Sequence, residues 1–64
     1  MEINFNKIRY YRIKKGMTLD ELAKKTELSK GYLSHLETGG RSNPSLGTIL
    51  KIASVLEEDI GNLF

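Results

Sequence analysis

Cysteine is absent from this chain of 64 residues, and so are long apolar runs. Without cysteine there can be no disulfide and no thiolate zinc site, so side-chain packing must supply the stability. No stretch approaches the roughly 20 apolar residues of a membrane span, and the first residues lack the apolar segment of a signal peptide. β-Branched residues are scattered and never alternate for long, which argues against strands. We therefore expect a soluble, intracellular, α-helical protein.

The charge is small but unevenly distributed. The net charge is +2 at neutral pH. Residues 1–43 hold nine Lys/Arg and five Asp/Glu, a balance of +4, whereas residues 44–64 hold one lysine and three acids, a balance of −2. A basic first part and a mildly acidic second part suit a polyanion bound on one side. An ordinary solvated surface explains the same asymmetry equally well.

Helical spacing of apolar residues recurs along the chain and predicts five helices in a single domain, residues 1–64. Asn4 can cap the first helix, which ends at Gly16, because glycine enters the left-handed region without strain. Thr18 and Glu21 have the spacing of a capping box and begin the second helix. Such a short chain buries only about 60% of its unfolded surface, so each cap matters.

The second half of the chain continues the helical pattern. Ser29 can cap a third helix, and Ser45 can cap a fourth that holds Leu46, Ile49, Leu50, Ala53 and Leu56. Residues 39–44 between them form a loop by composition. Asp59 begins a short fifth helix. The apolar residues there are partly core, and any surplus would form a small dimer seam: Ile60, Leu63 and Phe64.

Residues 18–37 have the mechanics of two helices joined by a tight turn. Ala23 stands where the helices cross, and its small side chain permits close approach. Leu28 follows the turn as an apolar plug, and Leu33 and Leu36 fasten the second helix to the core. Each feature alone is common, but together they are specific for a helix-turn-helix.

On these residues the chain resembles the lambda and 434 repressor/Cro-type DNA-binding domains, the XRE helix-turn-helix family. The segments SKGYLSHLE and SNPS look most like the SinR-type repressors of Gram-positive bacteria. The resemblance implies a compact, five-helix, all-α fold in which helices 2 and 3 form the helix-turn-helix. It also implies a dimer on palindromic operators in a bacterial cytosol, or a phage-encoded protein acting there. The resemblance is carried by Ile8, Arg12, Gly16, Thr18, Glu21, Leu22, Ala23, Ser29, Leu33, Ser34, Glu37, Gly39, Asn43, Pro44, Ser45, Leu50, Ile52, Ala53, Leu56, Leu63 and Phe64.

The resemblance further implies an ion pair between Arg12 and Glu37 that ties the first helix to the end of the third, as scaffold and not as a DNA contact. Two positions depart from the family pattern. Leu19 stands where many members have a glutamine that contacts phosphate, so it can offer only its backbone N–H. Glu27 stands where many have glycine. If Glu27 is left-handed, it costs about 1–2 kcal/mol relative to glycine.

The third helix is expected to enter the major groove by its N-terminal part. Four residues on its polar face are the candidates for base contact: Lys30, Gly31, Ser34 and His35. An ammonium can donate to guanine O6 and N7, although phosphate contact or solvation is the alternative. His35 has no second His or Cys with which to share a metal, and no partnered nucleophile for catalysis.

Contacts to phosphate are expected from hydroxyls, lysines and the loop before the fourth helix. The ring of Tyr32 can pack under the second helix while its hydroxyl meets a phosphate, and the alternative for the loop is an ordinary turn. Tyr10 and Tyr11 are better explained as structural or surface residues. The phosphate candidates are Thr18, Lys24, Lys25, Ser29, Tyr32, Arg41 and Asn43.

The sequence therefore predicts a sequence-specific transcription regulator, a repressor, that binds double-stranded DNA as a homodimer. No cofactor, metal or membrane is expected. Catalysis is not expected either, because neither a pocket nor an acid–base pair is visible. The alternative is a protein-interaction module, antitoxin-like or bound by a protein antagonist, with only non-specific DNA binding. Further domains in a longer regulator are compatible with both readings.

Overall fold

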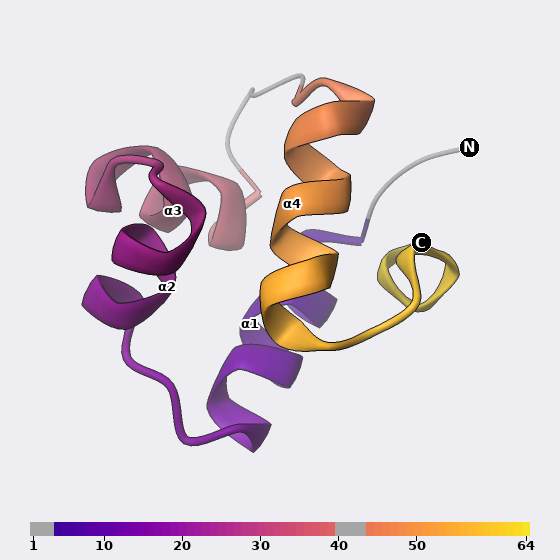
Figure 1. Ribbon diagram of the computed structural model, residues 1–64, viewed down its shortest axis with the longest axis horizontal. Helices are drawn as coiled ribbons and strands as arrows, with labels where there is room; N and C mark the ends of the chain where they lie inside the picture. Colours follow the sequence, from indigo (N-terminus) through magenta and orange to yellow (C-terminus); the bar gives the residue numbers. More distant parts are fainter. Residues whose placement is uncertain (1–3, 40–43) are drawn as a thin grey trace.

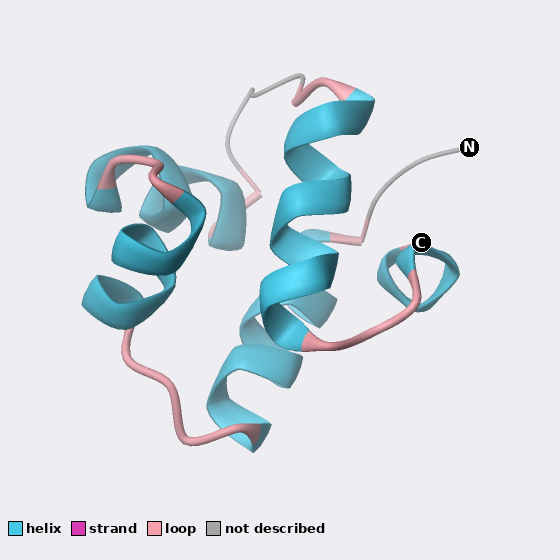
Figure 2. Ribbon diagram, in the orientation of Figure 1, coloured by secondary structure: helices cyan, strands magenta, loops and turns pink. Residues whose placement is uncertain are grey.

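The computed structural model describes residues 4–39 and 44–64. Its elements are α1 (Phe5–Lys14), α2 (Leu19–Thr26), α3 (Lys30–Glu37), α4 (Leu46–Leu56) and the short 3₁₀ helix η1 (Ile60–Leu63). Figure 1 shows α2 and α3 on one side of α4 and η1 on the other, with α1 behind. Short loops join α1 to α2, α2 to α3 and α4 to η1, and no strand occurs within the described ranges (Figure 2). The all-α class is confirmed.

The predicted fifth helix is wrong, because within residues 4–39 and 44–64 the structure has four α-helices and, at the predicted fifth position, a four-residue 3₁₀ turn. Asp59 precedes this turn but makes no side-chain cap. The backbone instead forms the tighter three-residue bonds, from Asn62 N–H to the Asp59 carbonyl and from Phe64 N–H to the Gly61 carbonyl. Glycine and asparagine at its centre have low helix propensity, which explains why no full α-turn develops.

The predicted starts of α1, α2, α3 and α4 are confirmed, and at each of these four a side-chain oxygen accepts a backbone N–H. Asn4 accepts from the amide of Asn6 at 3.1 Å, and Ser45 accepts from that of Thr48 at 3.2 Å. In α2 the full capping box is present, with Thr18 and Glu21 each bonded to the other's backbone amide. These local bonds set where the helices begin.

The turn between α2 and α3 does hold a left-handed residue at Glu27, with φ 60°. A side chain at this φ is strained, and glycine is the residue that avoids the strain. Glu27→Gly should therefore raise the free energy of unfolding by about 1 kcal/mol, after the greater freedom of glycine in the unfolded chain is subtracted. Urea unfolding followed by circular dichroism measures this change.

A matched control is Lys51→Gly on the exposed side of α4, where the backbone is ordinary helix. This variant should lose about 0.5–1 kcal/mol. If both glycine variants lost stability, the left-handed turn would not be the source of strain at Glu27.

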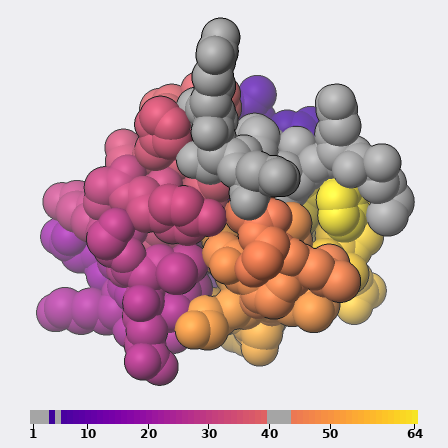
Figure 3. Space-filling view, turned by 90° about the horizontal axis from the view of Figure 1, so that it is seen from above, coloured from indigo at the N-terminus to yellow at the C-terminus, as the bar shows by residue number. Residues whose placement is uncertain are grey.

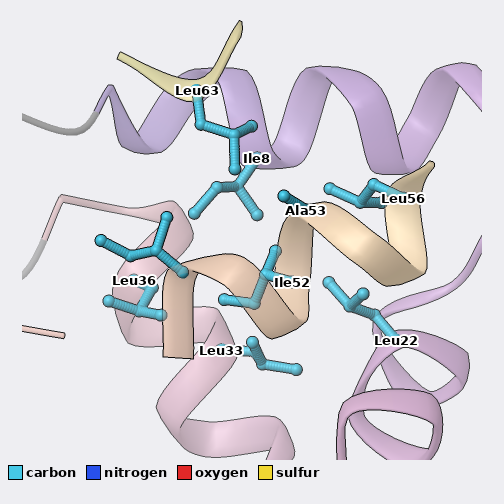
Figure 4. Packing of buried hydrophobic residues seen from close by; sticks show 9 residues of the cluster. Ile8, Leu22, Leu33, Leu36, Ile52, Ala53, Leu56 and Leu63 are labelled. Carbon is cyan, nitrogen blue, oxygen red and sulfur yellow. The ribbon is translucent and has the colours of Figure 1, made fainter. Parts of the chain in front are cut away.

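One apolar core receives side chains from every element, as Figure 4 shows for most of its members. Leu63 of η1 is fully buried beside Ile8 of α1, and the amide of Asn4 donates to the Leu63 carbonyl at 2.7 Å. Leu63 is therefore core and contributes nothing to a dimer seam. The core consists of Ile8, Leu22, Leu33, Leu36, Ile49, Ile52, Ala53, Leu56 and Leu63.

Within the described part of the chain, large apolar side chains are exposed on α4 and on α1. Leu46 and Leu50 lie one turn apart on α4 and are 63% and 48% exposed, so only part of the apolar set of that helix faces the core. Tyr10 and Ile13 are exposed on α1. None of the helices in the described part of the chain has the length and apolar content needed to cross a membrane.

Candidate nucleic-acid interface

An ion pair fixes the end of α3 to α1. The Nε and Nη2 atoms of Arg12 donate to the two carboxylate oxygens of Glu37 at 2.7 and 3.0 Å, and Nη1 donates to the Met17 carbonyl at 2.9 Å. The two side chains are only 13% and 6% exposed. This is the pair that the resemblance implied, and its two-pronged geometry holds α3 in one orientation.

Residues 27–29 form the turn that joins α2 to α3. Leu28 and Ala23 are half-buried and pack against the core, and Thr26 is fully buried with its hydroxyl donating to the Leu22 carbonyl at 2.7 Å. Buried side chains thus attach α2 and α3 to the core, and the outer side of α3 remains exposed to solvent. Seen from above, α2, α3 and the start of α4 share one face of the molecule (Figure 3).

The four candidate base-contacting residues lie together on the exposed side of α3. Lys30, Gly31, Ser34 and His35 are all exposed, whereas Leu33, Leu36 and Glu37 on the opposite side are buried. Positions three and four residues apart are neighbours on one face of a helix, which groups Lys30 with Ser34 and Gly31 with Ser34 and His35. We call these four exposed residues the α3 face. It offers an ammonium, a hydroxyl, an imidazole and a bare stretch of backbone.

Gly31 has no internal reason to be glycine. A Cβ built there would meet nothing within 4 Å, and the backbone is ordinary helix. A glycine in a helix is less favourable than alanine by about 0.5–1 kcal/mol. No contact among the described residues therefore requires glycine at this exposed position.

The hydroxyl groups of Thr18 and Ser29 each cap a helix and still have an O–H that can donate a hydrogen bond. Both are exposed, and each side-chain oxygen accepts a backbone amide at 3.1 Å, from Glu21 and Tyr32 respectively. Each hydroxyl proton is left available for an outside acceptor such as a phosphate oxygen. Lys24 and Lys25 are exposed on α2.

The remaining phosphate candidates have different surroundings. Tyr32 is half-buried and packs against the core. Packing and an outward hydroxyl are compatible in tyrosine, because its ring is apolar and its tip polar. Arg41 and Asn43 lie outside the described residues.

Two carboxylates begin α2, and the structure gives them different partners. Glu21 accepts the Thr18 amide at 3.0 Å, and this backbone hydrogen bond, with help from the Thr18 hydroxyl, holds the pKa of Glu21 below its ordinary value. Asp20 instead lies with its Oδ1 3.2 Å from the Nζ of Lys30. This contact could not be predicted from the sequence, because no local pattern links residues ten positions apart on different helices.

No cluster of three or more His, Cys, Asp or Glu side chains suitable for a metal occurs in residues 4–39 and 44–64. Most polar side chains of the α2–α3 unit are exposed, and the two buried ones, Thr26 and Glu37, are hydrogen-bonded inside the domain. This arrangement defines an all-α helix-turn-helix domain.

The chain belongs to the HTH_3 helix-turn-helix family, whose model matches residues 8–63. The chain is 40% identical to the HTH-type transcriptional regulator SlrR of Bacillus subtilis (strain 168) over 57 residues, which cover 89% of this chain and 38% of SlrR. It is 39% identical to the regulator SinR of the same organism, again over 57 residues, covering 89% of this chain and 51% of SinR. The chain thus spans about half or less of the length of these two relatives. The expected family is confirmed.

Solved structures show the same fold. The crystal structure of SinR, the master regulator for biofilm formation, in complex with DNA has a TM-score of 0.87 at 37% identity, over 94% of this chain and 98% of that chain. A complex of SinR with the SinI protein has the same TM-score and identity, over 94% of this chain and 58% of that chain.

Proposed function

We propose that this chain is the sequence-specific DNA-binding part of a transcription regulator, with α3 lying in the major groove. The observation that carries the proposal is the α3 face, which is polar and exposed while the opposite side of the same helix is buried and held by the Arg12–Glu37 pair. A rigid helix with an outward polar face fits the width of the major groove. The likeness to a SinR structure in complex with DNA supports the proposal.

Each residue of the α3 face has a role in this proposal. The ammonium of Lys30 donates to guanine O6 and N7, while Ser34 and His35 donate to or accept from base edges one turn further on. Gly31 lets the backbone come close to the groove wall. These contacts read sequence.

Phosphate contacts set the position of the domain on the duplex. We assign them to the free hydroxyl protons of Thr18 and Ser29, to Lys24 and Lys25, and to the first amides of α2. Leu19 takes part only through its backbone N–H. From the sequence, Tyr32, Arg41 and Asn43 are retained in the same role.

We further propose that the regulator is a homodimer that represses from a palindromic operator in the cytoplasm of a prokaryote. A two-fold dimer places its two α3 helices in successive major grooves, about 34 Å apart on one side of the duplex. The expected half-site spacing is therefore one helical turn. A protected region confined to a single groove would contradict the dimer.

Selection from random duplexes at about 0.15 M salt tests DNA reading directly, because exposed charges are partly screened there. The proposal predicts that a two-fold symmetric sequence is enriched and is bound much more tightly than its scrambled version. Equal binding of both duplexes over the whole salt range would overturn it.

A protein-interaction module is the second candidate. Two observations favour it: the structural likeness to SinR in complex with the SinI protein, and the exposed apolar side chains of Tyr10 and Ile13 on α1. This function predicts weak, steeply salt-dependent DNA binding with no preferred sequence. The same selection experiment separates the two.

Gly31→Ala should affect stability and binding in opposite directions. The folded chain has room for the methyl group, so the free energy of unfolding should rise by about 0.5 kcal/mol. The same methyl group would separate the helix from the groove and weaken binding to the selected duplex about tenfold. Thermal unfolding and a fluorescence anisotropy titration measure the two effects.

Gly47→Ala is the matched control, since Gly47 is also the second residue of its helix and a Cβ there meets only Ser45 Oγ at 3.9 Å. It should gain similar stability and leave specific binding nearly unchanged. Unaltered binding by Gly31→Ala would argue that no groove wall approaches Gly31.

A further inference from the structure

We propose that Asp20 is a specificity-determining residue that acts by positioning Lys30. This inference rests on the proposed function and adds a residue that lies on α2, outside the helix expected to read bases. Asp20 is in the first turn of α2 and Lys30 in the first turn of α3, and their side chains meet at 3.2 Å. The pair therefore bridges the N-terminal ends of the two helices of the helix-turn-helix.

The pair is not needed for the fold. Its side chains are 66% and 59% exposed, and exposed ion pairs contribute little to stability because water and salt screen them. Asp20 is not needed for the cap of α2 either, since Thr18 and Glu21 make that cap between them. Asp20 therefore has no evident structural role, and it lies beside Lys30 at the edge of the α3 face.

A carboxylate at this edge would ordinarily oppose DNA binding. It lies within reach of the ammonium that is proposed to enter the groove, so on the duplex it is brought close to phosphates that repel it. The repulsion acts on every sequence alike. Asp20 therefore lowers binding to random DNA, and a compensating gain is available only on sequences where Lys30 finds its acceptors.

Asp20 supplies that gain by limiting where Lys30 can reach. A lysine on a flexible stem is a point charge that follows the nearest phosphate and carries no sequence information. One of the three N–H donors of the Lys30 ammonium is directed at Asp20, which restricts the positions that the ammonium can reach. Two donors remain for DNA. Guanine presents two acceptors on its major-groove edge, O6 and N7, which match those two donors.

Two consequences follow for Asp20→Asn, which keeps the shape and removes the charge. Binding to a scrambled duplex should strengthen, and its salt dependence should steepen by about 0.9 in log–log slope, because one more positive charge is free to meet phosphate. At the base pair read by Lys30, discrimination between the preferred and the substituted pair should fall about threefold, as suits the strength of an exposed ion pair.

A double-mutant cycle tests whether Asp20 works through Lys30. Wild type, Asp20→Asn, Lys30→Met and the double variant are titrated against the selected duplex and against duplexes substituted at each base pair in turn. The inference predicts that Asp20→Asn lowers discrimination at one base pair in the wild-type background and changes discrimination at no base pair in the Lys30→Met background. Asp20→Glu, which keeps the carboxylate, should retain most of the discrimination.

Asp59→Asn is the matched control, because it removes one exposed carboxylate beside η1, on the other side of α4 from the α3 face. It should leave discrimination at every base pair unchanged. Circular dichroism of all variants verifies that each is folded.

Three results would contradict the inference. Unchanged discrimination by Asp20→Asn would mean that the Asp20–Lys30 contact has no part in sequence recognition. An equal loss in the Lys30→Met background would mean that Asp20 contacts a base itself. If the wild type preferred no sequence at all, the proposed function would fail, and this inference would fail with it. If the wild type does discriminate and Asp20→Asn discriminates equally well, only the role of Asp20 is contradicted.

Discussion

Replacing Glu37 with glutamine is expected to cost about 3–5 kcal/mol and to leave a large fraction of the chain unfolded. The substitution keeps the shape of the side chain but removes the charge that the Arg12 guanidinium meets at 2.7 and 3.0 Å in a nearly closed site. A domain of this length has only about 3–10 kcal/mol of total stability, so the loss is close to the whole. Urea unfolding monitored by circular dichroism measures it.

The exposed pair between Lys15 and Glu57 is the control for Glu37→Gln. Its atoms are 3.4 Å apart and the Glu57 side chain is 80% exposed, so Glu57→Gln should change stability by less than about 1 kcal/mol. The double variant Arg12→Met/Glu37→Met should recover much of the stability that Glu37→Gln loses, because no unpaired charge remains buried. If Glu37→Gln were as mild as Glu57→Gln, the Arg12–Glu37 pair would not be what holds α3 in place.

Lys30→Ala is expected to weaken binding to the selected duplex by about 1–3 kcal/mol, roughly ten- to hundredfold, and to relax sequence preference at one base pair. Binding to a scrambled duplex should change far less, because Asp20 already offsets the charge of Lys30 in the free protein. Anisotropy titrations with both duplexes at about 0.15 M salt measure the two affinities.

Lys24→Ala and Lys25→Ala are the controls for Lys30. Both lysines are exposed on α2 and are assigned to phosphate, so each substitution should weaken binding to all sequences alike and reduce the salt slope by about 1. If Lys30→Ala behaved in the same way, Lys30 would be a phosphate contact and the base-reading role would pass to Ser34 and His35.

The helix boundaries could be predicted because they depend on local chemistry. Asn4, Thr18, Ser29 and Ser45 are each within three residues of the amide that they cap, so the sequence already contains both partners. The last element could not be predicted in this way. Asp59 resembles a cap, but no side-chain bond forms there and the turn tightens to 3₁₀.

Features that depend on packing between elements were harder to predict from the sequence. The spacing of Leu46 and Leu50 fits the apolar side of α4, yet both are exposed, because the helix carries more apolar residues than its neighbours can cover. Glu57 is left-handed at φ 57°, at a helix end that no glycine or asparagine marked. Helical periodicity fixes which residues share a face but not how wide the covered arc is.

The same distinction applies to the candidate site. The α3 face could be predicted from Leu33 and Leu36, since burying those residues turns Lys30 and Ser34 outward. The Arg12–Glu37 pair was available only through the family resemblance. The Asp20–Lys30 contact was available from neither, because it depends on the angle at which α2 and α3 meet.

Nuclear magnetic resonance of the nitrogen-15-labelled chain, titrated with the selected duplex, tests the central claim most directly. If α3 lies in the major groove, the largest amide shift changes should fall at the start of α2 and along Lys30–His35, and α1 and η1 should change little. A scrambled duplex should produce smaller, salt-sensitive changes without those along α3. Changes concentrated on α1 around Tyr10 and Ile13, with the α3 amides unmoved, would contradict the account.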